Sequence, residues 1–288
     1  MCVQVLIRAT KYSRTFQSAV AFMHGFAPDV DVSRMSALQM ADNNTLCTPQ
    51  TGHQCACAAV ESGFLDAFSV PFGQRSSSIR DLPAVHRIAA RLRLTVDKLP
   101  RLSHVFDVAM AHFCHGFAVD CLGAEFVRDV FHVTDEIGRL TVSDVDYQRL
   151  ARLKLQPLVY EIAHRMKQQA LAFNGNSLPK FILYSGHDSS IEPLAAVFEV
   201  SSGAWPRYAS RLVFELYAPT KETYSDMEAG LRVLHDGEDV TSRVSFCKGL
   251  VASSVCPLKA FLDFVNDSKF AGGPGETGYT EACRHLVS

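Results

Sequence analysis

Two stretches of the chain share one hydrophobic pattern, in which a short apolar run leads into a polar turn and then into an amphipathic segment. The first apolar run covers residues 3–7 and the second covers residues 181–184. A short apolar run bounded by a turn indicates a buried strand, and the helical spacing behind it indicates a helix. The pattern therefore predicts two strand-to-helix junctions, the places where open α/β sheets position their ligand sites.

Between the two junctions the spacing of the hydrophobic residues changes. Residues 29–80 show no regular pattern and are expected to be irregular. Residues 81–172 keep the helical period almost throughout, and Pro157 is expected to kink the last helix of this block. The block therefore predicts a helical cap over the sheet.

Four further elements follow the second junction. Residues 211–217 predict a strand, and residues 231–240 predict two strands joined at Asp236-Gly237, a typical hairpin turn. Residues 257–265 predict a short closing helix. Because strands joined by a hairpin are antiparallel, we expect an α/β fold with a mixed, mainly parallel sheet.

Several of the predicted helices carry an apolar stripe at helical spacing, and we expect these side chains to face the interior. The stripes are Phe16, Val20, Met23 and Ala27 in the first helix, Leu82, Val85, Ile88, Ala89 and Leu92 in the next, Leu102, Val105, Phe106, Ala109, Met110 and Phe113 in a third, and a longer one over residues 145–172.

The overall composition excludes several classes of protein. The 288 residues are 48% hydrophobic and 20% charged with a formal net charge of −2, which is ordinary for a globular protein. Lysine and arginine form no runs, so no nucleic-acid partner is expected. No apolar run approaches the ~18 residues that a membrane-spanning helix needs.

The nine cysteines indicate an oxidising compartment, and two glycosylation sequons, at Asn43 and Asn266, agree with it. Several cysteines lie in near pairs, namely Cys55 with Cys57, Cys114 with Cys121 and Cys247 with Cys256, whereas Cys2, Cys47 and Cys283 lie outside them. We expect disulfides, including one from Cys114 to Cys121.

Two clusters of His and Cys raise the alternative of a metal site. They are His53, Cys55 and Cys57, and His112, Cys114 and His115. The first cluster lacks the spacing of a common zinc site, and no second pair completes it. For the second cluster, a disulfide and a helix C-cap at Gly116 are more economical. No metal is expected.

The polar residues at the second junction carry candidate chemistry. His187 and Asp188 lie where the strand ends and the helix begins, and Ser189 with Glu192 fits a capping box. A helix N-terminus offers unpaired N–H groups and partial positive charge to an anion. A charged His can donate to a phosphate oxygen, and an Asp can protonate a leaving oxygen. The alternative is a His-Asp pair that only caps the helix.

The first junction offers two arginines, Arg8 and Arg14. A planar guanidinium matches the oxygens of a phosphate and can bind two of them at once. The alternative is that both arginines lie on the surface at the start of a helix.

Together the two junctions resemble the histidine acid phosphatase family, a branch of the phosphoglycerate-mutase-like fold. The family motif Arg-x-Thr-x-x-x-Arg-Thr-x-x-Ser-Ala is matched by residues 8–19, and Tyr-Ser-x-His-Asp is matched by residues 184–188. Residues 205–216 also follow the family pattern. The resemblance implies a three-layer fold in which residues 1–288 form a single domain, with a helical cap insertion at about 80–172.

The resemblance also implies the roles of three residues. Arg14 matches a phosphate-binding arginine, His187 a second phosphate-contacting histidine, and Asp188 the proton donor. No catalytic role is carried over to Arg8. The family reaction needs no metal and no cofactor.

Further matches along the chain resemble one branch of this family, which acts in the Golgi lumen. They include Tyr12-Ser13-Arg14-Thr15, His112-Phe113-Cys114-His115 and Tyr279-Thr280-Glu281-Ala282-Cys283. The branch removes a 2-phosphate from the xylose of the proteoglycan linkage region, so phosphorylated xylose is the implied substrate; glycosyltransferase partners stay unknown. The alternatives within the family are a broad acid phosphatase, a phytase and a lysophosphatidate phosphatase.

One family segment has no counterpart here. The family nucleophile is the His of Arg-His-Gly-x-Arg-x-Pro on a central first strand, and no such segment occurs in the 288 residues. His24 and His115 each precede a glycine, but neither follows an arginine. The N-terminus also lacks a signal-peptide pattern.

This departure leaves two interpretations. We expect an N-terminally incomplete chain of an active enzyme, which lacks the first strand and the family's membrane anchor. The alternative is a pseudoenzyme that binds phosphorylated sugar or a partner protein without chemistry. In either case we expect little turnover from these residues alone.

Overall fold

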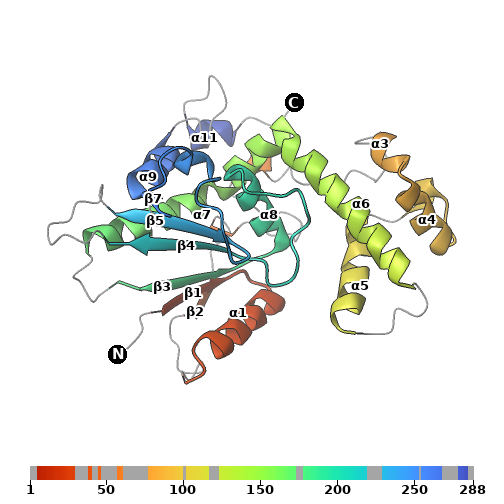
Figure 1. The fold of residues 1–288 in the computed structure, drawn as a ribbon, viewed down its shortest axis with the longest axis horizontal. Coiled ribbons are helices and arrows are strands. Elements are labelled where there is room, and N and C mark those ends of the chain that lie inside the picture. The colour runs from red at the N-terminus through yellow and green to blue at the C-terminus, as the bar shows by residue number, and fades with distance from the viewer. Residues whose placement is uncertain are drawn as a thin grey trace.

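The fold is seen in a computed structural model (Figure 1). It describes residues 5–29, 38–40, 45–46, 57–60, 77–99, 102–116, 123–172, 178–218, 229–252, 254–267 and 278–284.

A three-stranded parallel sheet carries both predicted junctions. It consists of β1 (Val5–Ala9), β2 (Leu38–Met40) and β3 (Phe181–Ser185), with β1 in the centre. The predicted strands at 3–7 and 181–184 are confirmed as β1 and β3. The expectation that 29–80 is wholly irregular is wrong at β2 and at the helix α3 (Ser77–Arg80), because three or four residues are too few to show a strand or helix period.

A second group of strands is antiparallel. It consists of β4 (Leu212–Tyr217), β5 (Gly230–His235), β6 (Glu238–Asp239) and β7 (Cys256–Pro257). The predicted hairpin is confirmed: Asp236 and Gly237 join β5 to β6 with positive φ angles of 52° and 92°. Among the described residues, β3 pairs only with β1 and β4 only with β5.

Helices cover the strands on both sides, which gives three layers (Figure 1). The helix α1 (Ser13–Phe26) packs on β1 and β3. Beyond the other side lie α7 (Val145–Leu171), α8 (Asp188–Val197), α9 (Leu258–Asn266), α11 (Tyr279–Ala282) and the short turn η4 (Ser245–Cys247). The main core lies among these helices and β5, with Phe198, Phe261 and Leu231 fully buried in it.

The remaining helices form a lobe beside the sheet (Figure 1). They are α3 (Ser77–Arg80), α4 (Pro83–Arg91), η3 (Val96–Lys98), α5 (Leu102–Cys114) and α6 (Gly123–Ser143). A second core cluster holds this lobe together, with Val85, Ile88 and Val130 fully buried. The predicted helical period of residues 81–172 is therefore confirmed. Pro157 lies inside α7, and its kink stays a prediction.

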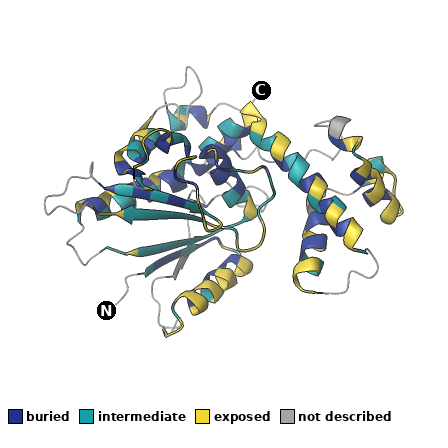
Figure 2. Cartoon of the chain, in the orientation of Figure 1, coloured by how far each residue is buried: buried dark blue, intermediate teal, exposed yellow. Residues whose placement is uncertain are grey.

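Two of the predicted apolar stripes are partly wrong. On α1 the buried residues are Thr15, Ala19 and Met23, whereas the Phe16 side chain is 47% exposed. Thr15 and Ala19 are thus buried in place of Phe16 and Val20, whereas Met23 belongs to both the predicted stripe and the buried face. On α5, Phe113 lies in the last turn and is 59% exposed, although its ring contacts Phe131 of α6 edge-on at 5.9 Å. Figure 2 shows the largely exposed outer face of α1.

Two disulfides link described residues. Cys57 bonds to Cys283, and Cys247 bonds to Cys256. The expected bond from Cys114 to Cys121 is wrong, because Cys114 is a free, exposed thiol at the end of α5. Cys121 lies outside the described residues, as do Cys2, Cys47 and Cys55. The predicted C-cap at Gly116 is confirmed by its φ of +62° and its hydrogen bond to Phe113 O.

No helix in the described part of the chain combines the length and the apolar character needed to cross a lipid bilayer.

Candidate active site

Both predicted junctions lie at the same edge of the parallel sheet. In the register of β1 and β3, Ala9 is opposite Ser185, so the two strands end side by side. The backbone N–H of Thr10 then donates to Ser185 O at 3.2 Å, which extends the pairing into the turns. Both α1 and α8 therefore begin at this edge, and their N-terminal N–H groups face one region.

Arg14 and His187 meet in this region. Arg14 lies in the first turn of α1 and His187 is the N-cap residue of α8. Their Nη2 and Nδ1 atoms are 3.3 Å apart. The Tyr12 ring supports both groups, because the guanidinium lies 4.4 Å from its centroid and the imidazole contacts it edge-on at 5.1 Å.

The second ring nitrogen of His187 contacts a pair of threonines. Its Nε2 lies 2.9 Å from Thr10 Oγ1, which lies 2.7 Å from Thr15 Oγ1. Thr15 Oγ1 in turn donates to Tyr12 O at 2.8 Å. Both threonines are buried, so these hydroxyls depend on one another for hydrogen bonds.

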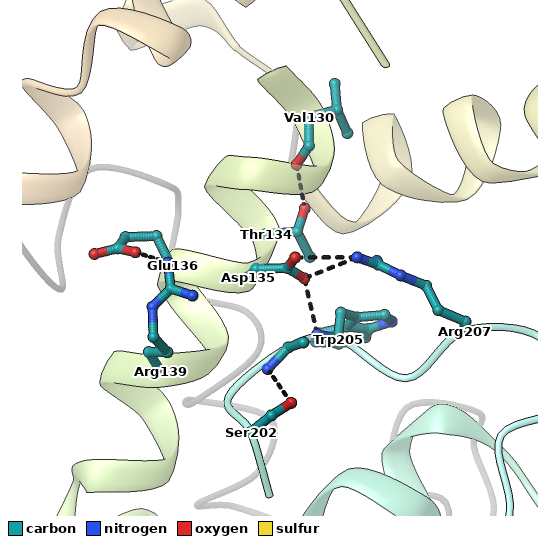
Figure 3. A network of polar contacts seen from close by, with 9 residues as sticks. Val130, Thr134, Asp135, Glu136, Arg139, Ser202, Trp205 and Arg207 are labelled. Atoms are coloured by element: carbon teal, nitrogen blue, oxygen red, sulfur yellow. Dashed lines mark hydrogen bonds and ion pairs between the residues drawn. The ribbon is translucent and has the colours of Figure 1, made fainter. Parts of the chain in front are cut away.

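Asp188 is held at both carboxylate oxygens. Oδ1 accepts the backbone N–H of Ser189 at 2.7 Å, and Oδ2 accepts the indole N–H of Trp205 at 3.2 Å. The helical lobe holds Trp205, because its backbone N–H donates to Asp135 of α6 at 3.0 Å. Arg207 also pairs with Asp135, and Figure 3 shows this network. The sheet region, through α8, and the helical lobe, through Trp205, therefore both help to position Asp188.

The charge of His187 depends on its surroundings. Burial, and then the nearby charge of Arg14, lower the pKa of His187 to about 4, against the opposing effect of Asp188. Lys154 of α7 lowers it further. His187 is therefore a neutral imidazole near neutral pH when the site holds no anion.

Lys154 is a charge beneath this site that the sequence analysis did not identify. It is 4% exposed, and its ammonium group donates to Ser189 O in the first turn of α8. Burial lowers its pKa to about 7, although Asp188 acts in the opposite direction. The available signal was a lysine at the spacing of the apolar positions of this helix, such as Leu150 and Leu158.

The helical lobe contributes a second carboxyl group. Burial raises the pKa of Asp107 on α5, and the charge of Asp188 raises it further, whereas His104 and Arg14 oppose this. Phe106, the preceding residue, packs against Trp205 with ring centroids 5.8 Å apart. The site is thus bounded by the sheet edge on one side and by α5 on the other.

Arg8 lies apart from the contacts of His187. Its guanidinium pairs with Glu161 of α7, which also accepts hydrogen bonds from Arg165 at 2.8 Å and Tyr184 at 2.9 Å. Burial would raise the pKa of Glu161, but these donors outweigh it and lower the pKa. Arg8 therefore links the sheet to α7.

The predicted N-cap of α8, Ser189, is wrong by two positions, because the N-cap residue is His187. The helix begins at Asp188, so Ser189 lies inside it, and Ser190 Oγ accepts the backbone N–H of His187 at 3.4 Å. Glu192 is buried instead of capping the helix, and burial raises its pKa to about 8. The helix starts earlier than predicted because His187 takes the N-cap position.

The structure brings Arg14, His187 and Asp188 together, and their roles stay proposals. The two His-Gly pairs lie elsewhere: His24 is exposed on α1, and His115 is exposed just beyond α5. Of the candidate metal ligands, Cys57 is in a disulfide, and His53 and Cys55 lie outside the described residues. The described residues include no group of three or more His, Cys, Asp or Glu side chains that could hold a metal ion.

Curated relatives match nearly the whole chain. The chain is 30% identical over 315 residues to 2-phosphoxylose phosphatase 1 of Danio rerio, covering 99% of this chain and 60% of that protein. The human 2-phosphoxylose phosphatase 1 is 28% identical, covering 97% and 58%. Human lysosomal acid phosphatase is 24% identical, covering 95% and 66%. The chain thus spans about 60% of the length of the 2-phosphoxylose phosphatases it matches. No family model matches it.

Solved structures agree on the fold. The Hafnia alvei phytase in complex with tartrate superposes with a TM-score of 0.62 at 14% identity, covering 98% of this chain and 80% of that one. The Citrobacter braakii phytase has a TM-score of 0.58 at 17% identity, covering 100% and 82%.

The chain has the α/β fold of the histidine acid phosphatases, and it resembles that family in sequence along nearly its whole length. Among the curated relatives, the particular resemblance is to the 2-phosphoxylose phosphatases, at 27–30% identity.

Proposed function

We propose that Arg14, His187 and Asp188 bind the phosphoryl group of a phosphomonoester in a hydrolase of the histidine acid phosphatase type. The observation that carries the proposal is the 3.3 Å approach of Arg14 to His187 where α1 and α8 both begin. A guanidinium, an imidazole and two helix N-termini around one point suit a phosphoryl dianion.

The three residues divide the chemistry between them. Arg14 stabilises the charge on the transferred phosphoryl oxygens, and His187 contacts another of them. Asp188 gives its proton to the oxygen of the departing alcohol as the P–O bond breaks. The nucleophile of the family reaction is a histidine that forms a phosphohistidine, which water then hydrolyses to inorganic phosphate.

That nucleophile has no counterpart among these 288 residues, so we expect phosphoester binding without appreciable turnover by this chain. Removing a nucleophile from other covalent enzymes costs several powers of ten in rate. The family nucleophile lies on a strand, and the unpaired edges of β3 and β4 within the described residues are compatible with a strand in that place.

We propose 2-phosphoxylose in the proteoglycan linkage region as the substrate, because several relatives at 27–30% identity are 2-phosphoxylose phosphatases. We also propose that the protein acts in the lumen of the Golgi apparatus. The two disulfides support an oxidising compartment of this kind.

The missing counterpart of the nucleophile favours a second candidate, a pseudophosphatase that only binds phosphorylated sugar. Calorimetric binding of xylose 2-phosphate and release of phosphate, both measured on the 288-residue chain, test the phosphate binding that the two candidates share and the expected lack of turnover. Binding without turnover is expected. Clear phosphatase activity would contradict the assignment of the nucleophile. Tighter binding of inositol hexaphosphate or lysophosphatidate than of xylose 2-phosphate would contradict the substrate.

A further inference from the structure

The two ring nitrogens of His187 face groups with fixed hydrogen-bonding roles. On one side, the Arg14 guanidinium can only donate, so Nδ1 at 3.3 Å must accept and carries no proton. A neutral imidazole then carries its proton on Nε2, which lies 2.9 Å from Thr10 Oγ1. The contact with Arg14 therefore selects the Nε2–H tautomer.

The threonine pair selects the same tautomer from the other side. A backbone carbonyl only accepts, so the Thr15 hydroxyl donates its proton to Tyr12 O at 2.8 Å. Thr15 Oγ1 then accepts from Thr10 at 2.7 Å, and the Thr10 hydroxyl, having donated its proton, accepts from His187. Two independent sets of contacts thus hold the proton on Nε2.

This arrangement affects how the site can bind an anion. Nδ1 is the ring nitrogen beside Arg14, the residue proposed to bind the phosphoryl oxygens, and two acceptors in contact repel each other. An anion beside Nδ1 therefore needs a proton on that nitrogen. The neutral ring cannot supply it by changing tautomer, because Nε2–H is already bonded to Thr10.

We propose that an oxyanion bound at this site is held by a doubly protonated His187, so that binding takes up one proton, and that Thr10 and Thr15 are the positioning residues that impose this. The proposal rests on the proposed function, because it concerns the same anion site. It adds that binding weakens as the pH rises, even for an anion whose own charge does not change.

Several charged groups lie near His187, and proton uptake by them must be distinguished from proton uptake by His187. They are Arg14 on α1, Lys154 on α7 and Asp188 on α8. Lys154, with a pKa of about 7, is already charged at about pH 5.5, whereas His187, with a pKa of about 4, is still neutral there. That pH therefore isolates proton uptake by His187 from uptake by Lys154.

The experiment is calorimetric binding of inorganic sulfate to the full chain at about pH 5.5, in buffers of different ionisation enthalpy. Sulfate does not titrate in this range, so proton uptake belongs to the protein. We expect uptake approaching one proton per sulfate. We expect Thr10→Val to lower this uptake to less than half of the wild-type value. Thr15→Val should cause a smaller decrease. Thr141→Val on α6 is the matched control and should leave it unchanged.

A second measurement uses the unmodified chain, so it does not depend on whether a variant folds. The long-range proton–nitrogen NMR spectrum of His187 should show a protonated Nε2 and a bare Nδ1 in the free chain, and two protonated nitrogens with sulfate. Asp188→Asn should keep the uptake; its loss in that variant would assign the proton to Asp188 and overturn the proposal. Sulfate binding without proton uptake would overturn this proposal alone, whereas no binding of sulfate or of xylose 2-phosphate would overturn the proposed function as well.

Discussion

At the scale of single residues, the site depends on one contact between distant parts of the chain. Arg14 and His187 are 173 positions apart, and β1 and β3 bring them together by ending in register. Their residue types and their places at strand ends could be predicted from the sequence. Lys154, Thr10 and Thr15 could not be assigned roles in this way, because their roles arise from contacts across the fold.

Replacing Arg14 tests the anion site directly. We expect Arg14→Gln to weaken sulfate binding by about 10- to 100-fold, because a charged hydrogen bond contributes roughly 1.5–3 kcal/mol. Isothermal calorimetry at constant pH and salt measures this. Arg243→Gln is the control, since Arg243 lies at the surface in a pair with Glu238. Equal affinities of wild type and Arg14→Gln would contradict the assignment.

At the scale of elements, Glu161 joins β1 and β3 to α7 through Arg8 and Tyr184. We expect Glu161→Gln to lower the unfolding free energy by about 3 kcal/mol near pH 7, because it leaves the Arg8 charge without its carboxylate. Urea denaturation measures the loss. The exposed ion pair of Arg243 and Glu238 gives the comparison, and Glu238→Gln should lower the unfolding free energy much less.

The effect of Glu161 should depend on pH. The pKa of Glu161 in the folded chain is lowered from the ordinary 4.5. Its contribution to the unfolding free energy is therefore complete above pH 4.5 and disappears as the pH falls through the folded-state pKa. The difference between wild type and Glu161→Gln should therefore narrow below pH 4.5. A difference that stays constant down to acid pH would argue against the ion pair as its cause.

The interface of α7 and α8 should show a pH dependence of the same sign, but at higher pH. Burial lowers the pKa of Lys154 to about 7 from 10.5, so between these values the unfolded chain binds one more proton than the folded chain. The unfolding free energy of wild type should then rise with pH in that window relative to Lys154→Met. Urea denaturation at several pH values measures it, with the exposed Lys259→Met as control. Parallel curves for wild type and Lys154→Met would contradict the burial of a charge.

At the scale of the whole molecule, one disulfide closes most of the chain. Cys57 and Cys283 are 226 residues apart, whereas Cys247 and Cys256 are 9 apart. In the chain-entropy model the longer loop stabilises by about 5 kcal/mol and the shorter by about 3 kcal/mol. We expect the double variant Cys57→Ala, Cys283→Ala to lose more unfolding free energy than Cys247→Ala, Cys256→Ala. The reverse order in denaturant titrations would contradict this.

Local patterns account for what the sequence could predict of the fold. The strands β1, β3 and β4, the turn at Asp236-Gly237 and the helical period of residues 81–172 each follow from neighbouring residues, and the structure contains them. The Cys57–Cys283 pairing could not be predicted, because cysteine spacing does not define connectivity. The burial of Thr15 on α1 in place of Phe16 could not be predicted, because Thr15 is polar and its hydroxyl finds its partners, Thr10 and Tyr12, only in the folded chain.

Trp205 is the only tryptophan of the chain, and its indole N–H donates to Asp188. Its ring also packs against Phe106 of the helical lobe. Tryptophan emission is sensitive to charge and hydrogen bonding at the indole, and here all of it comes from one place. The protein therefore has a built-in fluorophore that touches Asp188, the proposed proton donor, and the opposite wall of the site, so that ligand entry can be followed by intrinsic fluorescence without any label.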